Sequence, residues 1–319
     1  MNSFSEENTQ PSISVVVPVY GCAGCLEQLC DRLIQSLQDI TNRFEILLVD
    51  DRSPDDSLGV IRAIQLRHSE VECIRLSRNF GQHIAISAGL SVARGDYSVV
   101  MDCDLQDPPE IIPELFAKIK EGYDLVMARR AERSHSHFRI FAAKAYFWLL
   151  SKLNEEDIDG SYGSFCMLSR KVVNSFLEFN ERERHFLFIL RWLGFKMGSI
   201  EYAHQERTIG NSSYSLKRLL RHAIDGIFFQ STVFLRWIVS LGLLFSILGI
   251  ILALYFVFQY FAYGSVVGWT SLIVILLVCT GVILSSMGVI GLYVGKIFDQ
   301  TKGRPLYVID TIVKGRATW

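Results

Sequence analysis

The first 130 residues alternate between short apolar runs and stretches with helical spacing. Five apolar, β-branched runs are predicted strands: residues 13–19, 44–49, 71–76, 97–101 and 124–128. Four stretches are predicted helices: 26–37, a segment that Ser53 or Asp55 can cap, 84–93 and 115–121. Nearly all-apolar strands that alternate with helices are typical of a parallel sheet covered on both faces. We therefore predict an α/β protein with a Rossmann-like, mostly parallel sheet.

A different pattern begins after residue 212. Basic and apolar residues alternate over 213–232, which predicts an amphipathic helix at a membrane interface. No Asp, Glu, Lys, Arg or His occurs from Trp237 to Gly295. A run of this length is sufficient for two membrane helices, predicted at 233–261 and 269–294 within a membrane domain at 233–295.

Basic residues flank the uncharged run on both sides, with Arg218 and Arg221 before it and Lys296 and Lys302 after it. The positive-inside rule then predicts a multi-pass protein of the inner (cytoplasmic) membrane with both termini cytoplasmic. Residues 296–319 are a predicted cytoplasmic tail. Four glycines permit close helix packing, so a homo-oligomer is expected through the membrane helices: Gly281, Gly288, Gly291 and Gly295.

Composition narrows the choice of partners. The net charge of −1 provides no field that attracts nucleic acid, so no nucleic-acid partner is expected. The polar, acidic stretch 1–11 lacks the basic start and apolar core of a signal peptide, and a disordered tail is expected there. The seven cysteines are scattered and mostly within apolar runs, which predicts reduced, packed thiols. The Cys22-x-x-Cys25 spacing is compatible with redox chemistry, but no second cysteine pair completes a zinc site.

Polar side chains gather where the predicted strands end. These positions hold Tyr20, the pair Asp50 and Asp51, the pair Asp102 and Asp104, and finally Arg129 with Arg130. Ligands of open α/β sheets bind at the carboxyl ends of the strands. Neither G-x-G-x-x-G after the first strand nor G-x-x-x-x-G-K-[ST] is present, so a phosphate-cradling loop is not expected.

The segment after the fourth predicted strand carries the strongest chemical signal. On an extended backbone Asp102 and Asp104 share one side, and Gln106 adds a third oxygen if the extension continues. Two carboxylates repel each other unless a cation lies between them, and Mg²⁺ or Mn²⁺ accepts both carboxylate and phosphate oxygens. The alternative is a solvated loop in which the aspartates form turns and caps. The other strand ends favour metal-supported diphosphate binding.

Four segments in this order resemble the GT-A glycosyltransferases of family 2, and more narrowly the polyprenyl-phosphate glycosyltransferases: 15–20, 49–53, 77–81 and 102–110. The resemblance implies a GT-A domain over residues 12–212. It implies that the nucleotide-sugar is bound by Pro18, Tyr20, Asp50, Asp51, Asp102 and Asp104. It implies metal ligation by Asp102, Asp104 and Gln106.

The resemblance also implies how the acceptor is held. Arg130 falls where the family has an arginine near the acceptor phosphate. Residues 207–214 resemble the family's Arg-x-x-Gly-x-Ser-Lys-Tyr, with Ser213 in place of Lys, so the acceptor phosphate would contact Arg130, Arg207, Ser212 and Tyr214. Asp104, Arg130 and Arg207 are the implied catalytic residues. The chain departs from the family at Gly21 and Cys22, and Ser164 and Cys166 replace its usual Asp and Arg.

The implied activity is inverting transfer of a hexose, such as glucose, from a nucleotide-sugar to polyprenyl (undecaprenyl) phosphate on the cytoplasmic face. Its role would be modification of a cell-surface glycan. A processive family 2 polysaccharide synthase is the alternative, but Phe188 and Val233 stand where its Gln-x-x-Arg-Trp motif requires Gln. A non-catalytic membrane partner with the same fold is a third interpretation, supported by the replacements at Ser164 and Ser213.

Overall fold

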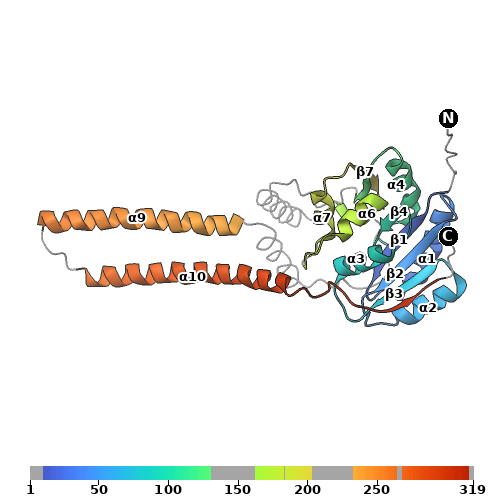
Figure 1. Cartoon of the computed structure of the whole chain (residues 1–319), viewed down its shortest axis with the longest axis horizontal. Helices are drawn as coiled ribbons and strands as arrows, with labels where there is room; N and C mark the ends of the chain where they lie inside the picture. The colour runs from blue at the N-terminus through green and yellow to red at the C-terminus, as the bar shows by residue number, and fades with distance from the viewer. Residues whose placement is uncertain (1–9, 131–161, 183, 203–232, 264–267, 316–319) are drawn as a thin grey trace, which may run out of the picture. The chain divides into compact units, whose positions relative to one another are not determined.

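The computed structural model describes residues 10–130, 162–182, 184–202, 233–263 and 268–315 of the 319-residue chain (Figure 1). Within these ranges eight strands form one sheet in the order β7-β5-β6-β4-β1-β2-β3-β8. The centre is parallel and consists of β1 (Ile13–Val19), β2 (Phe44–Asp50), β3 (Val71–Leu76) and β4 (Tyr97–Val100). The mostly parallel α/β fold is therefore confirmed.

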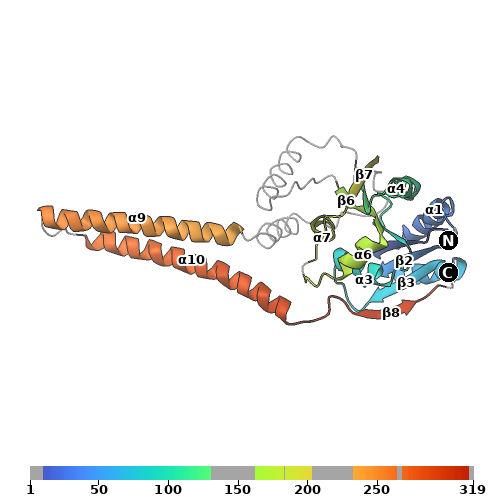
Figure 2. The same cartoon turned by 45° about the horizontal axis from the view of Figure 1, so that its top comes forward.

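Two antiparallel strands complete the sheet. β6 (Tyr162–Ser169) lies between β4 and β5 (Leu125–Arg130) and is antiparallel to both. β7 (Met197–Tyr202) pairs with β5 in parallel at one edge. β8 (Ile309–Val313) is antiparallel to β3 at the other edge, where Figure 2 shows the two strands together. The sequence patterns did not predict β6, β7 or β8.

Helices cover both faces of the sheet. One face packs against α1 (Leu26–Gln38), α2 (Ser57–Arg67) and α4 (Ile112–Ile119), and the other against α3 (Gln82–Val92), α6 (Arg170–Leu177) and α7 (Phe186–Trp192). Successive strand residues point to opposite faces, so Val15 and Val17 belong to the first core and Val16 to the second. This arrangement explains why the strands read as continuous apolar runs.

The observed elements begin and end within about three residues of the predicted positions, and the end of the fourth strand bears on the site. The fourth strand was predicted to reach residue 101, but β4 ends at Val100. A single hydrogen bond from the Met101 amide to the Val16 carbonyl, 3.2 Å long, extends the contact. After it, the short 3₁₀ helix η1 (Pro109–Ile111) precedes α4. The acidic segment therefore lies in a loop rather than on an extended strand.

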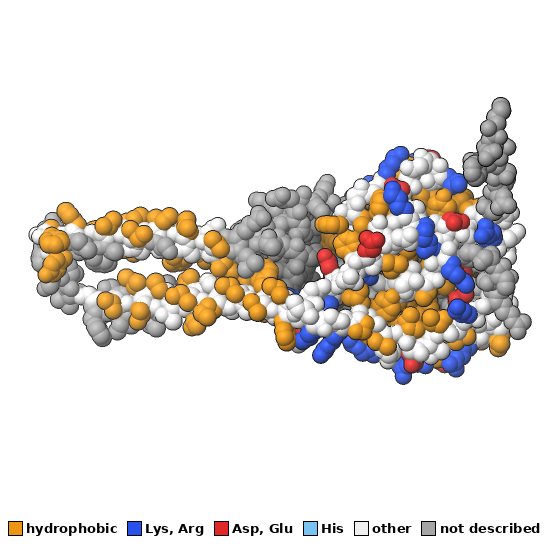
Figure 3. Space-filling model, in the orientation of Figure 1, with side chains coloured by type: hydrophobic (Ala, Val, Ile, Leu, Met, Phe, Trp, Pro, Cys, Tyr) orange, Lys and Arg blue, Asp and Glu red, His pale blue; other side chains and the backbone are white. Residues whose placement is uncertain are grey.

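The chain divides into two compact units. One comprises residues 1–136, 159–211 and 304–319, and the other 137–158 and 212–303. In the second unit α9 (Val233–Tyr263) and α10 (Trp269–Thr301) contact each other, and exposed apolar side chains line both helices (Figure 3). Cys279–Thr301 is the described stretch whose length and hydropathy suit a membrane crossing. Ile238–Leu252 is a shorter apolar stretch.

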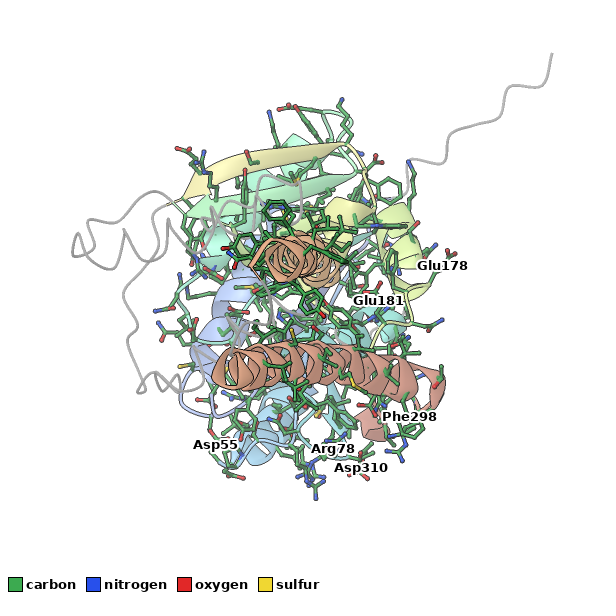
Figure 4. All side chains as sticks on the ribbon, turned by 90° about the vertical axis from the view of Figure 1, so that its left-hand side faces the viewer. Asp55, Arg78, Glu178, Glu181, Phe298 and Asp310 are labelled. Carbon is green, nitrogen blue, oxygen red and sulfur yellow. A yellow bond between two sulfur atoms is a disulfide. The ribbon has the colours of Figure 1, made fainter. Side chains whose placement is uncertain are left out.

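The predicted tail at 296–319 is organised differently in the structure. α10 continues to Thr301, and β8 returns to the sheet of the first unit. The Ser77 amide donates to the Val308 carbonyl (2.9 Å), and Asp310 on β8, labelled in Figure 4, forms an ion pair with Arg52 (3.5 Å). Residues 309–313 thus complete the β3 edge of the sheet, and the cytoplasmic placement of residues 296–319 stays a prediction. The predicted tail at 1–11 and the interfacial helix at 213–232 lie mainly or wholly outside the described residues.

Candidate active site

The loop after β4 is shaped by one unusual residue. Leu105 has a φ of 61°, in a backbone region that side chains other than glycine rarely adopt. Its side chain is 3% exposed and belongs to the core against α1 and α4. Burial of this leucine stabilises the turn, and Pro108 ends the loop before η1. The extended backbone assumed for Asp102, Asp104 and Gln106 is therefore wrong, because the chain turns at Leu105.

Asp102 is held by two side chains from other elements. Its Oδ1 accepts hydrogen bonds from Gln82 Nε2 at the start of α3 (2.6 Å) and from Ser164 Oγ on β6 (2.7 Å). Burial raises the pKa of Asp102 to about 6, and the carboxylates of Asp107 and Asp104 act in the same direction, while the bond from Ser164 opposes them. Burial and the neighbouring carboxylates thus outweigh the hydrogen bond from Ser164 and the charge of Arg130, which both favour the ionised form.

The donor set suits a hard divalent cation. The Gln106 amide donates to Oδ1 of Asp104 (3.2 Å), so the two predicted ligands lie on one turn. Repulsion between the carboxylates contributes to the raised pKa of Asp102, and a cation would remove that repulsion. Among the described residues no group of three His, Cys, Asp or Glu side chains is placed to bind a metal. A metal here would depend on two carboxylates, the Gln106 amide oxygen and oxygens of a ligand.

A second charged cluster adjoins the acidic turn. Asp107 is fully buried and forms an ion pair with Arg130 at the end of β5 (3.5 Å). The Tyr202 hydroxyl, at the end of β7, donates to Asp107 and accepts from Arg130 Nε (3.2 Å). Gly163 on β6 packs closely against this guanidinium, since a Cβ there would lie 3.1 Å from Nη2. The ends of β5 and β7 and the adjacent part of β6 therefore meet beside the motif that follows β4.

The other predicted acid pair, Asp50 and Asp51, has a different environment. Both residues are buried, at 1% and 2% exposure. Asp50 accepts from the Ser53 amide (2.8 Å) and forms an ion pair with Arg75 (3.2 Å). Asp51 accepts from the amides of Phe80 (2.7 Å) and Gly81 (2.8 Å), one with each oxygen. Burial raises the pKa of Asp51, and these two hydrogen bonds oppose that effect.

The remaining predicted residues are those for the nucleotide-sugar on β1 and those for the acceptor. Pro18 is buried in β1, whereas Tyr20 at its end is 51% exposed and accessible to a ligand. The loop after β1 is attached to the loop after β2, because the Ala23 amide donates to Asp55 (3.0 Å). Three of the four residues implied for the acceptor lie outside the described residues: Arg207, Ser212 and Tyr214.

A disulfide joins Cys22 of the first loop to Cys103, the residue between the two motif aspartates. The prediction of reduced thiols is therefore wrong for this pair, and Cys22 bonds with Cys103 instead of Cys25. The fold explains the pairing, because β1 and β4 are neighbours and their ends lie together. The prediction is confirmed for the buried free cysteines: Cys25, Cys30, Cys73 and Cys166.

Sequence reasoning missed three of the side chains that build this region. Gln82 and Asp107 stand beside motifs that were recognised, so their proximity in sequence was an available signal. No sequence signal points to Tyr202, because its contact with Asp107 joins residues 95 positions apart. Ser164 was noted as a family departure, but its hydrogen bond to Asp102 depends on the antiparallel strand β6, which was not predicted.

The fold and motifs agree with a comparison to known families. The sequence profile described as "Glycosyl transferase family 2" matches residues 14–177, just over half of the chain. The chain belongs to glycosyltransferase family 2. This glycosyltransferase is 38% identical to the uncharacterized glycosyltransferase YkcC of Bacillus subtilis, over 93% of each chain. It is 34% identical to the undecaprenyl-phosphate 4-deoxy-4-formamido-L-arabinose transferase of Proteus mirabilis, over 98% of its own length and 96% of the relative's.

A solved structure supports the fold of the glycosyltransferase. Glucosyl-3-phosphoglycerate synthase of Mycobacterium tuberculosis, in complex with Mn²⁺, UDP and phosphoglyceric acid, aligns with a TM-score of 0.50 at 18% identity. The alignment covers 68% of this chain and 76% of the synthase. It confirms the GT-A fold that the motifs implied. The chain is therefore an enzyme, a glycosyltransferase of family 2, and a divalent metal is compatible with its site.

Proposed function

We propose that this glycosyltransferase moves a hexose, such as glucose, from a nucleotide-sugar to undecaprenyl phosphate on the cytoplasmic face of the membrane. The observation that carries the proposal is the meeting of the acidic turn that holds Asp102 and Asp104 with a fixed arginine, Arg130, at the carboxyl edge of the sheet. An undecaprenyl-phosphate sugar transferase aligned over nearly the whole chain supports the choice of acceptor. The product would serve the modification of a cell-surface glycan.

The donor would lie across the ends of β1, β2 and β4. Tyr20 is exposed and suited to stack on a base or ribose, with Pro18, Asp50 and Asp51 shaping that end of the site. Asp102, Asp104 and Gln106 would hold Mg²⁺ or Mn²⁺ together with the diphosphate. When bound, the cation offsets negative charge on the leaving diphosphate. Asp50 and Asp51 are saturated by internal contacts, so we assign them to shaping the loops rather than to direct ionic contact.

The acceptor would approach from the side of Arg130. A phosphate monoester is already ionised near neutral pH, so its oxygen can attack the anomeric carbon without a general base. Direct attack from the face opposite the leaving group inverts that carbon. Arg130 would offset the repulsion between the acceptor phosphate and the donor diphosphate, together with Arg207, Ser212 and Tyr214. Ser164 orients Asp102 and does not act as a base.

The membrane arrangement is part of the proposal. We assign α9 and α10 to two crossings, with the GT-A domain and both termini cytoplasmic. The return of β8 to the sheet supports this assignment, because the strands before and after the helices then lie on one side. An even number of crossings satisfies that condition. A reporter fused to the C-terminus should be active only in the cytoplasm, and activity only outside would contradict the assignment.

A transfer assay tests the function. Purified protein in detergent is given undecaprenyl phosphate, Mg²⁺ or Mn²⁺, and one radiolabelled donor at a time from a panel of UDP- and GDP-sugars. We expect one donor to yield a lipid-soluble labelled product that requires the lipid phosphate. Undecaprenol replaces the phosphate as the matched control, and the Asp104→Asn protein reports background. A labelled polymer, or no lipid product with any donor, would contradict the proposal.

A further inference from the structure

The guanidinium of Arg130 is fixed on one edge and open on another. Nε donates to the Tyr202 hydroxyl (3.2 Å), and Nη2 lies 3.5 Å from Oδ1 of Asp107. Nη1 makes no hydrogen bond with a described residue, and the arginine side chain is 36% exposed. A planar fork that is held along one edge presents its other donors in a defined direction.

Tyr202 connects the two charged groups. Its hydroxyl donates to Asp107 and accepts from Arg130, so one oxygen orders both partners. The phenol is 5% exposed and packs edge-on against Phe165, with ring centroids 5.9 Å apart. Asp107 is fully buried and needs the arginine as its counter-charge. The direction of the guanidinium therefore depends on a rigid ring at the end of β7.

The backbone of β6 closes the remaining side. A Cβ on Gly163 would lie 3.1 Å from Nη2 of Arg130, closer than most real Cβ contacts. The guanidinium thus lies flat against a strand that has no side chain at this point. Ser164, the next residue, donates to Asp102 (2.7 Å), so the same strand segment contacts both the acidic turn and the arginine.

We propose that Tyr202 and Gly163 are positioning residues that aim the open edge of Arg130 at the acceptor phosphate. The inference rests on the proposed function and adds that the affinity for the phosphate depends on how the guanidinium is oriented, in addition to its charge. Tyr202 acts through Arg130 and does not itself contact the acceptor. The expected ligand is a phosphate monoester on a polyprenyl chain.

The test is a double-variant binding experiment with the full-length protein in detergent micelles. Dissociation constants for undecaprenyl phosphate and for undecaprenol are measured in the wild type and in Tyr202→Phe, which changes no charge. They are also measured in Arg130→Lys, which retains the charge but lacks the fork, and in the double variant. We expect about tenfold weaker binding of the phosphate in each single variant, with undecaprenol unaffected, because each loses a directed contact to a charged group.

The double variant shows whether Tyr202 acts through Arg130 or contributes to phosphate binding independently. If Tyr202 acts through the fork, the double variant binds like Arg130→Lys, to within about twofold. A further tenfold loss in the double variant, or unchanged binding in Tyr202→Phe, would overturn the inference and leave the proposed function intact. A wild type that does not distinguish undecaprenyl phosphate from undecaprenol would overturn both.

Two further variants complete the experiment: one controls for the loss of a tyrosine hydroxyl, and the other tests the position of the guanidinium separately. Tyr97→Phe is the matched control, because Tyr97 begins β4, at the end of the strand away from Asp102, and its hydroxyl makes no hydrogen bond with a described residue. It should bind both lipids as the wild type does. Gly163→Ala moves the guanidinium without altering Tyr202, and it too should bind the phosphate about tenfold more weakly. If Tyr202→Phe does not fold, wild-type binding in Gly163→Ala overturns the inference.

Discussion

Two acid pairs follow parallel strands on either side of β1, and the structure holds them in different ways. Asp50 and Asp51 end β2, and their oxygens are engaged by backbone amides and by Arg75. Asp102 and Asp104 follow β4, and burial raises the pKa of Asp102 to about 6, with the nearby carboxylates adding to the shift. The first pair organises loops within the protein. At the second pair, burial and neighbouring carboxylates disfavour the ionised form of Asp102, and a cation bound there would favour it.

An acidic pair at a strand end is therefore not by itself a ligand site. The two pairs differ in the kind of donor that holds them: backbone amides donate to Asp50 and Asp51, whereas side chains donate to Asp102. The loop after β3 turns its amides toward Asp51, whereas the turn at Leu105 brings Asp102, Asp104 and Asp107 together. The difference predicts that substitutions in the two pairs have opposite consequences for stability and activity.

The largest effect is expected for Asp104→Asn. Loss of a metal-holding carboxylate should lower kcat/KM on the order of 10³-fold, about 4 kcal/mol of barrier, because stabilisation of the leaving diphosphate is lost. The Tm should not fall, since one of two repelling charges is removed. Transfer kinetics and thermal unfolding measure both. A large fall in Tm would show that Asp104 is structural, as Asp51 is.

Arg130→Ala should have the next largest effect, costing about 2–4 kcal/mol of barrier, because a fixed cation near the phosphates is removed. Ser164→Ala is the milder companion. It removes one hydrogen bond to the Asp102 carboxylate and should cost about tenfold in kcat/KM, or ~1.4 kcal/mol. The measurement is kcat/KM with the lipid varied. If Ser164→Ala is as damaging as Arg130→Ala, residues 163–166 hold chemistry beyond the orientation of Asp102.

Asp51→Asn tests whether the pair Asp50 and Asp51 stabilises the fold. The carboxylate accepts two backbone amides, and an asparagine can accept only one of them while placing an NH₂ against the other. We expect a loss of about 2 kcal/mol in the free energy of unfolding. The kcat/KM of the folded protein should change less than in Asp104→Asn. Wild-type stability with strongly reduced transfer would reverse the assignment of the two pairs.

The smallest expected effect concerns the covalent link between the loop after β1 and the turn that holds Asp102 and Asp104. Counting reactive thiols tests this link. Cys103 stands between the two motif aspartates and is bonded to Cys22. Denatured, unreduced protein should label at five thiols, and reduction should raise the number to all seven. Mass spectrometry of the labelled protein gives the count. Seven labelled thiols before reduction would show that the acidic turn has no covalent link to the loop after β1.

The central strands and their polar ends could be predicted because their signals are local. Each of β1 to β5 is an apolar run buried on both faces, and parallel topology brings the ends of those strands to one edge. β6 and β8 could not be predicted in this way. β6 has a Tyr-Gly-Ser start that reads as a loop, and β8 pairs with β3 across more than 230 residues of chain, including both apolar helices.

The side-chain contacts at the site show the same limit. Asp102, Asp104 and Arg130 were identified from their positions after strands, and the structure brings them together. The bonds from Tyr202 to Asp107 and from Cys22 to Cys103 depend on which strands are neighbours. The turn at Leu105 depends on core packing that sequence spacing does not reveal.

Retention of Mn²⁺ is the most direct test of the difference between the two acid pairs. Wild-type protein, Asp104→Asn and Asp51→Asn are dialysed to equilibrium against Mn²⁺ with UDP and, separately, with GDP on both sides of the membrane. The wild type and Asp51→Asn should retain about one Mn²⁺ per chain with the appropriate nucleotide, and Asp104→Asn should retain much less. Retention by Asp104→Asn equal to the wild type, or loss in Asp51→Asn alone, would contradict the account.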